Sequence, residues 1–176
     1  MNSLYFTEFP VLRTQRFILR EISKEDSHSI YKIRSDENVA LYLDRLLAKD
    51  INDANDFINK ILEGYKNENA LYWIIEYNNK FTGSICLWRI DEKEETAELG
   101  FELLPPFQGK GIIQEVLPEV INFGFNKLEL KTIEAEVDKN NIKSISLLEK
   151  FGFIKIKEED KTFIYTLKYK IATLPY

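Results

Sequence analysis

The chain has 176 residues, of which 44% are hydrophobic, so it is long enough to bury one core and short for two. Its 29 acidic and 24 basic residues are interspersed and leave a net charge of -5, which argues against nucleic acid as the main partner. No stretch reaches the roughly 20 apolar residues of a membrane span, and no apolar run follows a basic start. We therefore expect a single domain, residues 1–176, that acts in the cytoplasm without a membrane partner.

The chain holds one cysteine, Cys86, and one histidine, His28. These two residues cannot build a disulfide framework, a zinc site or a Ser/His/Asp triad, so no metal is expected. Cys86 lies in an apolar run, which favours a buried core thiol over a nucleophile. His28 lies among polar residues, which favours an exposed position.

The first part of the chain predicts one strand and two helices. Residues 17–21 form a strand-like run, and Ser23 with Asp26 is an N-cap signature that opens a helix. Apolar residues recur at helical spacing over residues 52–66, which predicts the second helix.

Three strand-like runs follow, at residues 71–77, 81–90 and 96–104. Short polar segments connect them, which predicts an antiparallel meander. The last part of the chain predicts helices and strands in alternation.

Helical periodicity covers residues 111–127 and 142–150, and strand-like runs cover residues 132–138, the surroundings of Lys155 and residues 162–170. The order of these helices and strands along the chain predicts a mixed α/β fold with one twisted sheet of about seven strands and helices on both faces. The crossover through the helix at 111–127 requires parallel strands on either side of it.

The sharpest motif is a turn with two glycines, Gly109 and Gly111, that follows one strand and opens directly into a helix. Glycines let the backbone approach a ligand, and the first amides of a helix lack internal partners and favour negative charge. The turn therefore suits a pyrophosphate, although an ordinary strand-to-helix turn has the same spacing. A Walker loop is excluded because Lys110 precedes the second glycine, and a dinucleotide fingerprint is excluded because Gln114 replaces its third glycine.

The segments TAELGFELLPPFQGKGIIQEVL and IEAEVDKNNIKSISLLEKFGF closely resemble the GNAT superfamily of acetyltransferases, in particular its RimJ/RimL-type ribosomal-protein N-terminal acetyltransferases. The opening LRTQRFILREISKED is similar to the first strand and helix of that family. The resemblance implies a GNAT-like fold, acetyl-CoA as co-substrate, and transfer of the acetyl group to an amine. The amine acceptor is a protein N-terminus or a small molecule, and a homodimer is left open.

The resemblance also implies the cofactor-binding residues. The family loop R/QxxGxG/A holds the CoA pyrophosphate, and Gln108 and Gly111 match it. Backbone groups of the preceding strand pair with the pantetheine arm, and the asparagine of an NxxS segment contacts it, which corresponds to Asn141. Asn141 also suits a helix N-cap, whereas for Asn140 the cap alone is expected. The expected cofactor-binding set is Phe101, Glu102, Leu103, Gln108, Gly109, Lys110, Gly111, Ile112, Ile113, Gln114 and Asn141.

The reaction needs a group that takes the proton of the amine and an acid that protonates the leaving thiolate. Glu98 matches a glutamate that the family implicates as base, and Glu136, five positions before Asn141, is the competing base. Many family members use a tyrosine as acid where this chain has Leu148, so Ser144 of the NxxS segment is the expected replacement.

Three functions remain open from the sequence. The first is direct acetyl transfer in a ternary complex to a protein N-terminal amine, and the second is transfer to a small amine such as a polyamine or an antibiotic. The third is a CoA-binding module without catalysis, which the missing tyrosine favours slightly and which Glu98 and Ser144 disfavour.

Overall fold

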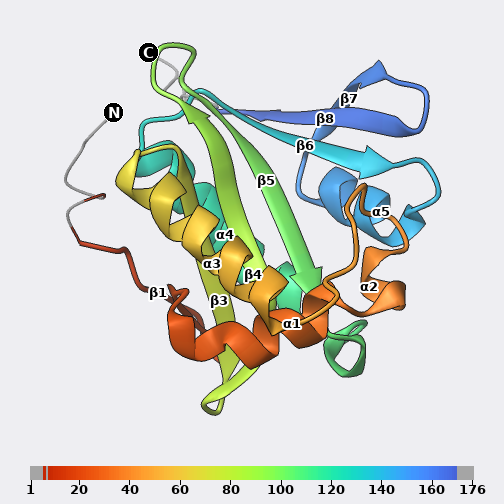
Figure 1. The fold of residues 1–176 in the computed structure, drawn as a ribbon. Coiled ribbons are helices and arrows are strands. Elements are labelled where there is room, and N and C mark those ends of the chain that lie inside the picture. Colours follow the sequence, from red (N-terminus) through yellow and green to blue (C-terminus); the bar gives the residue numbers. More distant parts are fainter. Residues whose placement is uncertain (1–5, 7, 170–176) are drawn as a thin grey trace, which may run out of the picture.

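The computed structural model describes residues 6 and 8–169 of the chain. In this part of the chain, eight strands form one mixed sheet in the order β1-β2-β3-β4-β5-β6-β8-β7 (Figure 1). The sheet has one strand more than expected because a two-residue strand, β1, pairs with β2. The strands are β1 (Leu12–Arg13), β2 (Ile18–Glu21), β3 (Ala70–Tyr77), β4 (Lys80–Asp91), β5 (Thr96–Leu103), β6 (Thr132–Asp138), β7 (Ile154–Glu158) and β8 (Thr162–Lys168). The end of the last predicted strand, residue 170, lies outside the described residues.

Helices cover both faces of the sheet, which confirms the predicted α/β class. The α-helices are α1 (Ser27–Arg34), α2 (Glu37–Ala40), α3 (Ile51–Lys66), α4 (Ile112–Asn126) and α5 (Ile142–Lys150), and the short 3₁₀ turns are η2 (Lys24–Asp26) and η3 (Pro105–Phe107). Helices α1 and α3 pack on one face, and α4 and α5 pack on the other. None of the described helices is both long and apolar enough to cross a membrane.

Helix α1 is tied to the sheet by the capping box that the sequence predicted. Asp26 is buried, and its carboxylate accepts hydrogen bonds from the backbone of Ser23 at 2.8 Å and from both terminal nitrogens of Arg20 at 2.9 and 2.8 Å. Such a charge-assisted, bidentate pair is among the stronger polar contacts in proteins. It holds the start of α1 against strand β2.

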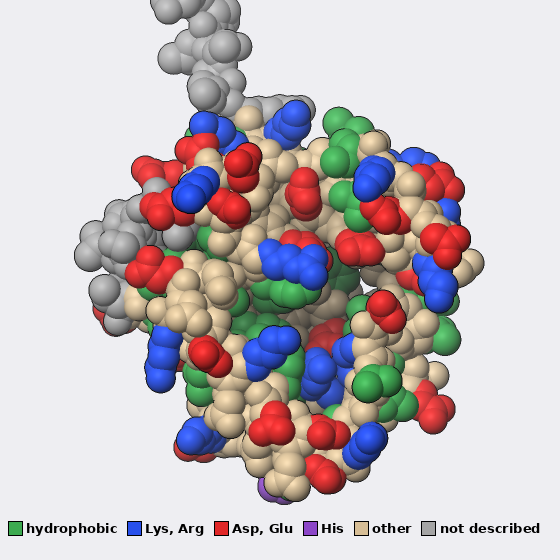
Figure 2. Space-filling view, turned by 45° about the horizontal axis from the view of Figure 1, so that its top comes forward, with side chains coloured by type: hydrophobic (Ala, Val, Ile, Leu, Met, Phe, Trp, Pro, Cys, Tyr) green, Lys and Arg blue, Asp and Glu red, His purple; other side chains and the backbone are tan. Residues whose placement is uncertain are grey.

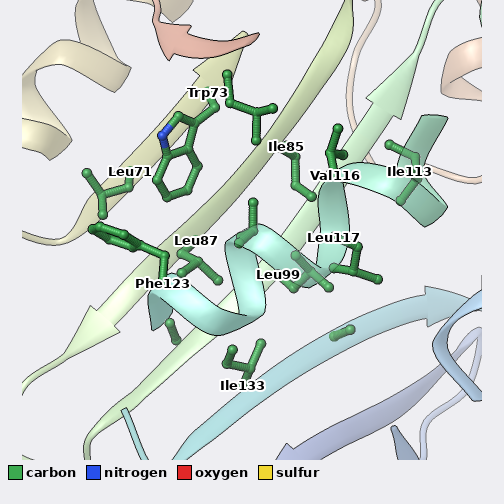
Figure 3. Packing of buried hydrophobic residues seen from close by; sticks show 14 of the residues in the cluster. Leu71, Trp73, Ile85, Leu87, Leu99, Ile113, Val116, Leu117, Phe123 and Ile133 are labelled. Atoms are coloured by element: carbon green, nitrogen blue, oxygen red, sulfur yellow. The ribbon is translucent and has the colours of Figure 1, made fainter. Parts of the chain in front are cut away.

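Helix α4 is positioned by its apolar face. Val116, Leu117 and Val120 are completely buried, and each such side chain contributes on the order of 1.5–3 kcal/mol. Figure 3 shows Val116 and Leu117 of the helix packed against strands from the same face of the sheet. The labelled residues are Leu71, Trp73, Ile85, Leu87, Leu99, Ile113, Val116, Leu117, Phe123 and Ile133. This packing places the first turn of α4 at the end of β5.

Strands β5 and β6 run parallel but separate soon after they begin (Figure 1). Their pairing covers residues 96–98 of β5 and 132–134 of β6. Beyond that point β5 stays paired with β4, and β6 stays paired with β8 along its full length. Beyond the paired residues, the inner edges of β5 and β6 diverge and leave backbone groups without a strand partner.

Candidate active site

The turn before α4 presents a row of free amides. Gly111 is the N-cap of α4 with φ 72°, and Gly109 has the same φ. The amides of residues 109–114 donate to no acceptor among the described residues, whereas Glu115 N already bonds to Gly111 O at 3.1 Å. A left-handed backbone followed by a helix start is a typical anion-binding arrangement. The turn can therefore bind a phosphate through its backbone.

The side chains of the predicted loop are directed elsewhere. Ile112 and Ile113 are buried in the core, so their amides alone can reach a ligand. Gln108 donates through Nε2 to the Leu103 carbonyl at 3.0 Å, which fastens the turn to the end of β5. Gln114 Oε1 accepts from Lys150 Nζ at 3.1 Å, and the exposed Lys110 adds a positive charge.

Arg16 lies beside this turn, a position that the sequence analysis missed. The carboxylate of Glu115, in the first turn of α4, accepts from Thr14 Oγ1 at 2.6 Å, Arg16 N at 2.9 Å and Arg16 Nε at 2.6 Å. These contacts leave Arg16 Nη2 4.0 Å from the point where a Cβ on Gly111 would lie. Arg16 and Glu115 are 99 positions apart in the sequence, and no motif connects the two segments.

The free edge of β5 faces the gap between β5 and β6. Residues 99–103 of β5 lack a partner on that side, and their other edge is paired with β4. Phe101 and Leu103 point toward the core beneath α4, and Glu102 points to the face covered by α1 and α3. An extended ligand arm could pair with such an edge as an added strand.

Asn141 is the N-cap of α5, and its Oδ1 accepts from the backbone of Ser144 at 3.2 Å. The expectation that Asn140 serves as a cap is wrong, because its side chain donates to Asp138 Oδ1 at 3.0 Å. The Ser144 hydroxyl has no hydrogen-bond partner among the described residues, and the Asn141 side chain already caps the helix. The hydroxyl of Ser144 is therefore available to a ligand.

Glu98 is the last residue of β5 that pairs with β6, so it lies where the two strands begin to separate. Its side chain is 19% exposed, and its Oε2 lies 2.9 Å from Arg89 Nη1. Burial raises the pKa of Glu98 above its usual range, Arg89 partly offsets this, and the charges of Glu134 and Glu136 raise it further. A partly buried carboxylate with a raised pKa is a reasonable general base.

Glu136, the competing base, has a different environment. It lies on β6 on the same face as Glu134, two positions further along, and it is exposed. Its Oε1 accepts from Thr162 Oγ1 at 2.8 Å, which directs it toward β8. The two glutamates thus differ in burial and in partner.

The remaining candidates have structural positions. Leu148, where many relatives carry a tyrosine, is buried in the core. The Cys86 thiol is surrounded by protein, and burial raises its pKa to about 12, so it is a poor nucleophile. His28 is exposed, as predicted.

The fold, the diverging strands and the glycine turn together define an acetyltransferase of the GNAT class. The family model described as Acetyltransferase (GNAT) domain matches residues 16–154, and the chain belongs to this family. The chain is therefore an acetyl-CoA-dependent N-acetyltransferase, as the RimJ/RimL-type resemblance predicted, and the non-catalytic alternative is set aside.

Individual relatives support the same assignment. The uncharacterised N-acetyltransferase YoaA of Bacillus subtilis is 32% identical over 149 residues, which cover 84% of each chain. Two solved structures share the fold. The spermidine N-acetyltransferase of Vibrio cholerae, in complex with CoA and spermine, has a TM-score of 0.79 at 20% identity and covers 87% of this chain and 95% of its own. RimL, a ribosomal L7/L12 α-N-protein acetyltransferase in complex with coenzyme A, has a TM-score of 0.82 at 14% identity and covers 90% and 98%.

Proposed function

We propose that this enzyme transfers the acetyl group of acetyl-CoA to the N-terminal α-amino group of a protein, by direct attack in a ternary complex. The observation that supports acetyl-CoA binding is the row of free amides at residues 109–114, which lies next to the cations Arg16 and Lys110. These donors suit the pyrophosphate, and the free edge at residues 101–103 suits the pantetheine arm. The Asn141 side chain contacts that arm from the start of α5.

The proposed chemistry uses two residues on the two sides of the gap. The amine nitrogen attacks the thioester carbonyl, a C–N bond forms and the C–S bond breaks. Glu98 takes the proton that the amine loses, and the Ser144 hydroxyl protonates the departing sulfur. Glu98 then releases its proton to water, and Ser144 regains one from water. Glu98 is favoured over Glu136 because it is the more buried carboxylate and lies where the strands part.

A small amine is the second candidate acceptor. Glu98, Glu134 and Glu136 share one face of the sheet beside the gap, and carboxylates attract a cationic amine. The Vibrio cholerae structure holds spermine, which is a fact about that protein. The acidic face is what favours this acceptor here.

A panel of acceptors tests the proposal. Acetyl transfer to short peptides, spermidine and an aminoglycoside is followed by release of the CoA thiol. The proposal expects peptides to give the highest kcat/KM and isothermal calorimetry to detect CoA binding. Faster transfer to spermidine than to the peptides would instead identify a small amine as the acceptor. The absence of both CoA binding and acetyl transfer would overturn the proposal.

The Ser144→Ala variant is expected to slow single-turnover acetyl transfer roughly a hundredfold, the lower range for loss of a general acid. The CoA affinity and the melting temperature should stay close to wild type, because the Asn141 side chain, and not this hydroxyl, caps α5. The exposed Ser146, on the same helix, supplies the matched Ser146→Ala control, which should react at the wild-type rate. An unchanged rate for Ser144→Ala would remove it from the mechanism.

A further inference from the structure

Two arginines and one glutamate meet under the end of α1, on the same face of the sheet as Glu98. We name Arg34, Arg45 and Glu102 the basic corner. Arg45 donates to the carbonyls of Arg34 at 2.7 Å and Ile33 at 3.2 Å, and to Glu102 Oε2 at 3.1 Å. The side chains of this last pair are 14% and 12% exposed. Arg45 and Glu102 therefore neutralise each other and fasten the 41–50 segment to the end of α1.

Arg34 is the second cation of the basic corner, and it has no carboxylate of its own. Its guanidinium carbon lies 3.9 Å from the centre of the Phe57 ring, which holds the group flat against an aromatic face. Among the described residues it has neither an ion pair nor a hydrogen bond through its side chain, although it is partly buried. Burial and the neighbouring Arg45 both lower its pKa, and Glu102 opposes them. The basic corner thus carries one uncompensated positive charge.

The basic corner lies at the far end of the strand face that carries the candidate base. Glu98 and Glu102 point to the same face of β5 and are four residues apart, which places them about 13 Å apart along the strand. Gly100 lies between them and presents no side chain to that face. Figure 2 shows one face of the molecule, with a hollow near its centre and acidic and basic side chains around that hollow. The strand face therefore carries Glu134 and Glu136 near Glu98 at one end, and Arg34 near Glu102 at the other.

We propose that the acceptor is a peptide with an acidic side chain next to its N-terminal residue, and that Arg34 binds this side-chain carboxylate while Glu98 faces the reactive amine. The proposal rests on the proposed acetyl transfer and names the chemistry of its acceptor. A guanidinium donates two parallel hydrogen bonds to a carboxylate, and its stacking on Phe57 orients it before the acceptor arrives. A polyamine would instead place a second cation beside an uncompensated one, which is repulsive. The carboxylate belongs to an acidic side chain near a peptide N-terminus, because the two charges of a free amino acid lie too close together to span the separation of about 13 Å along the strand.

Matched acceptors test the charge requirement and its source. The peptide amide Ser-Glu-Ala-Ala is compared with Ser-Gln-Ala-Ala, and serine is compared with serinamide. In the peptide pair, the carboxylate acceptor should have a kcat/KM at least about tenfold higher, the size expected for a hydrogen-bonded charge pair, and the serine pair should show no such preference. Equal values within the peptide pair, a preference for serine over serinamide, or a preference for spermidine would overturn the inference.

Variants then assign the preference to Arg34. Arg34→Gln should remove it by raising KM for the carboxylate acceptor about tenfold or more while kcat and CoA affinity change little. Arg34→Lys keeps the charge without the planar fork and should restore part of the preference. Lys32→Gln, an exposed cation on the same helix, should retain it fully.

Melting temperatures check that each variant is folded. A preference that persists in folded Arg34→Gln would overturn the role of Arg34. If the wild type neither binds CoA nor acetylates any amine, the proposed function fails and the inference fails with it. Transfer to amines without any effect of the carboxylate contradicts the inference alone.

Discussion

Replacement of Gly111 by leucine is expected to weaken CoA binding by at least about a hundredfold while the domain stays folded. Gly111 has φ 72°, and a Cβ there meets little protein, since Arg16 Nη2 at 4.0 Å is its nearest neighbour. The new side chain would instead occupy the space in front of the free amides. Loss of two charge-assisted hydrogen bonds of about 1.5–3 kcal/mol each accounts for the expected size.

Isothermal calorimetry with CoA and a thermal melt measure the two effects separately. Gly152 has φ 84° at the end of α5, with Leu167 Cδ1 3.7 Å from its built Cβ, so Gly152→Leu imposes similar backbone strain away from the turn. This control should lower the melting temperature comparably and keep its CoA affinity. Arg16→Gln should weaken CoA about tenfold, because one cation is removed and the amides remain. A folded Gly111→Leu variant with wild-type CoA affinity would show that the phosphates bind elsewhere.

The Glu98→Gln variant is expected to lower kcat by about a hundredfold or more at neutral pH, in the range for loss of a general base. At neutral pH most of an amine acceptor is protonated, so a group that removes the proton matters most there. The loss should shrink as the pH rises and the amine deprotonates by itself. Glu136→Gln is the matched control on the neighbouring strand and should lose much less. Equal losses of kcat in the two variants would contradict the assignment of Glu98 as the single base.

The pH dependence of kcat/KM gives an independent check, because two substitutions near Glu98 should shift it in opposite directions. Glu98 works as a base when it is deprotonated, so the activity falls as the pH drops through its pKa. Arg89 lowers that pKa and Glu136 raises it. Arg89→Gln should therefore shift the acidic limb of the profile to higher pH, and Glu136→Gln should shift it to lower pH. Shifts in the same direction would contradict Glu98 as the titrating base.

Local patterns in the sequence determined most of the helices and strands. Apolar spacing predicted α3 and α4 within a few residues, and β6 and α5 match their predicted ranges. Two short elements, β1 and α2, were missed because two and four residues are too few to show a period. The glycine turn was also readable, since a positive φ at Gly111 and a helix start are both local properties.

The tertiary structure decided the features that depend on distant partners. The separation of β5 from β6 depends on how far the two strands pair, which strand propensity does not specify. Arg16 reaches the turn through Glu115, 99 positions away, and Arg45 meets Glu102 across 57 positions. In the sequence Glu98 and Glu136 look alike, because each is a glutamate in a strand where apolar and polar residues alternate. They differ in burial and in partner, and those properties come from the packing of the whole chain.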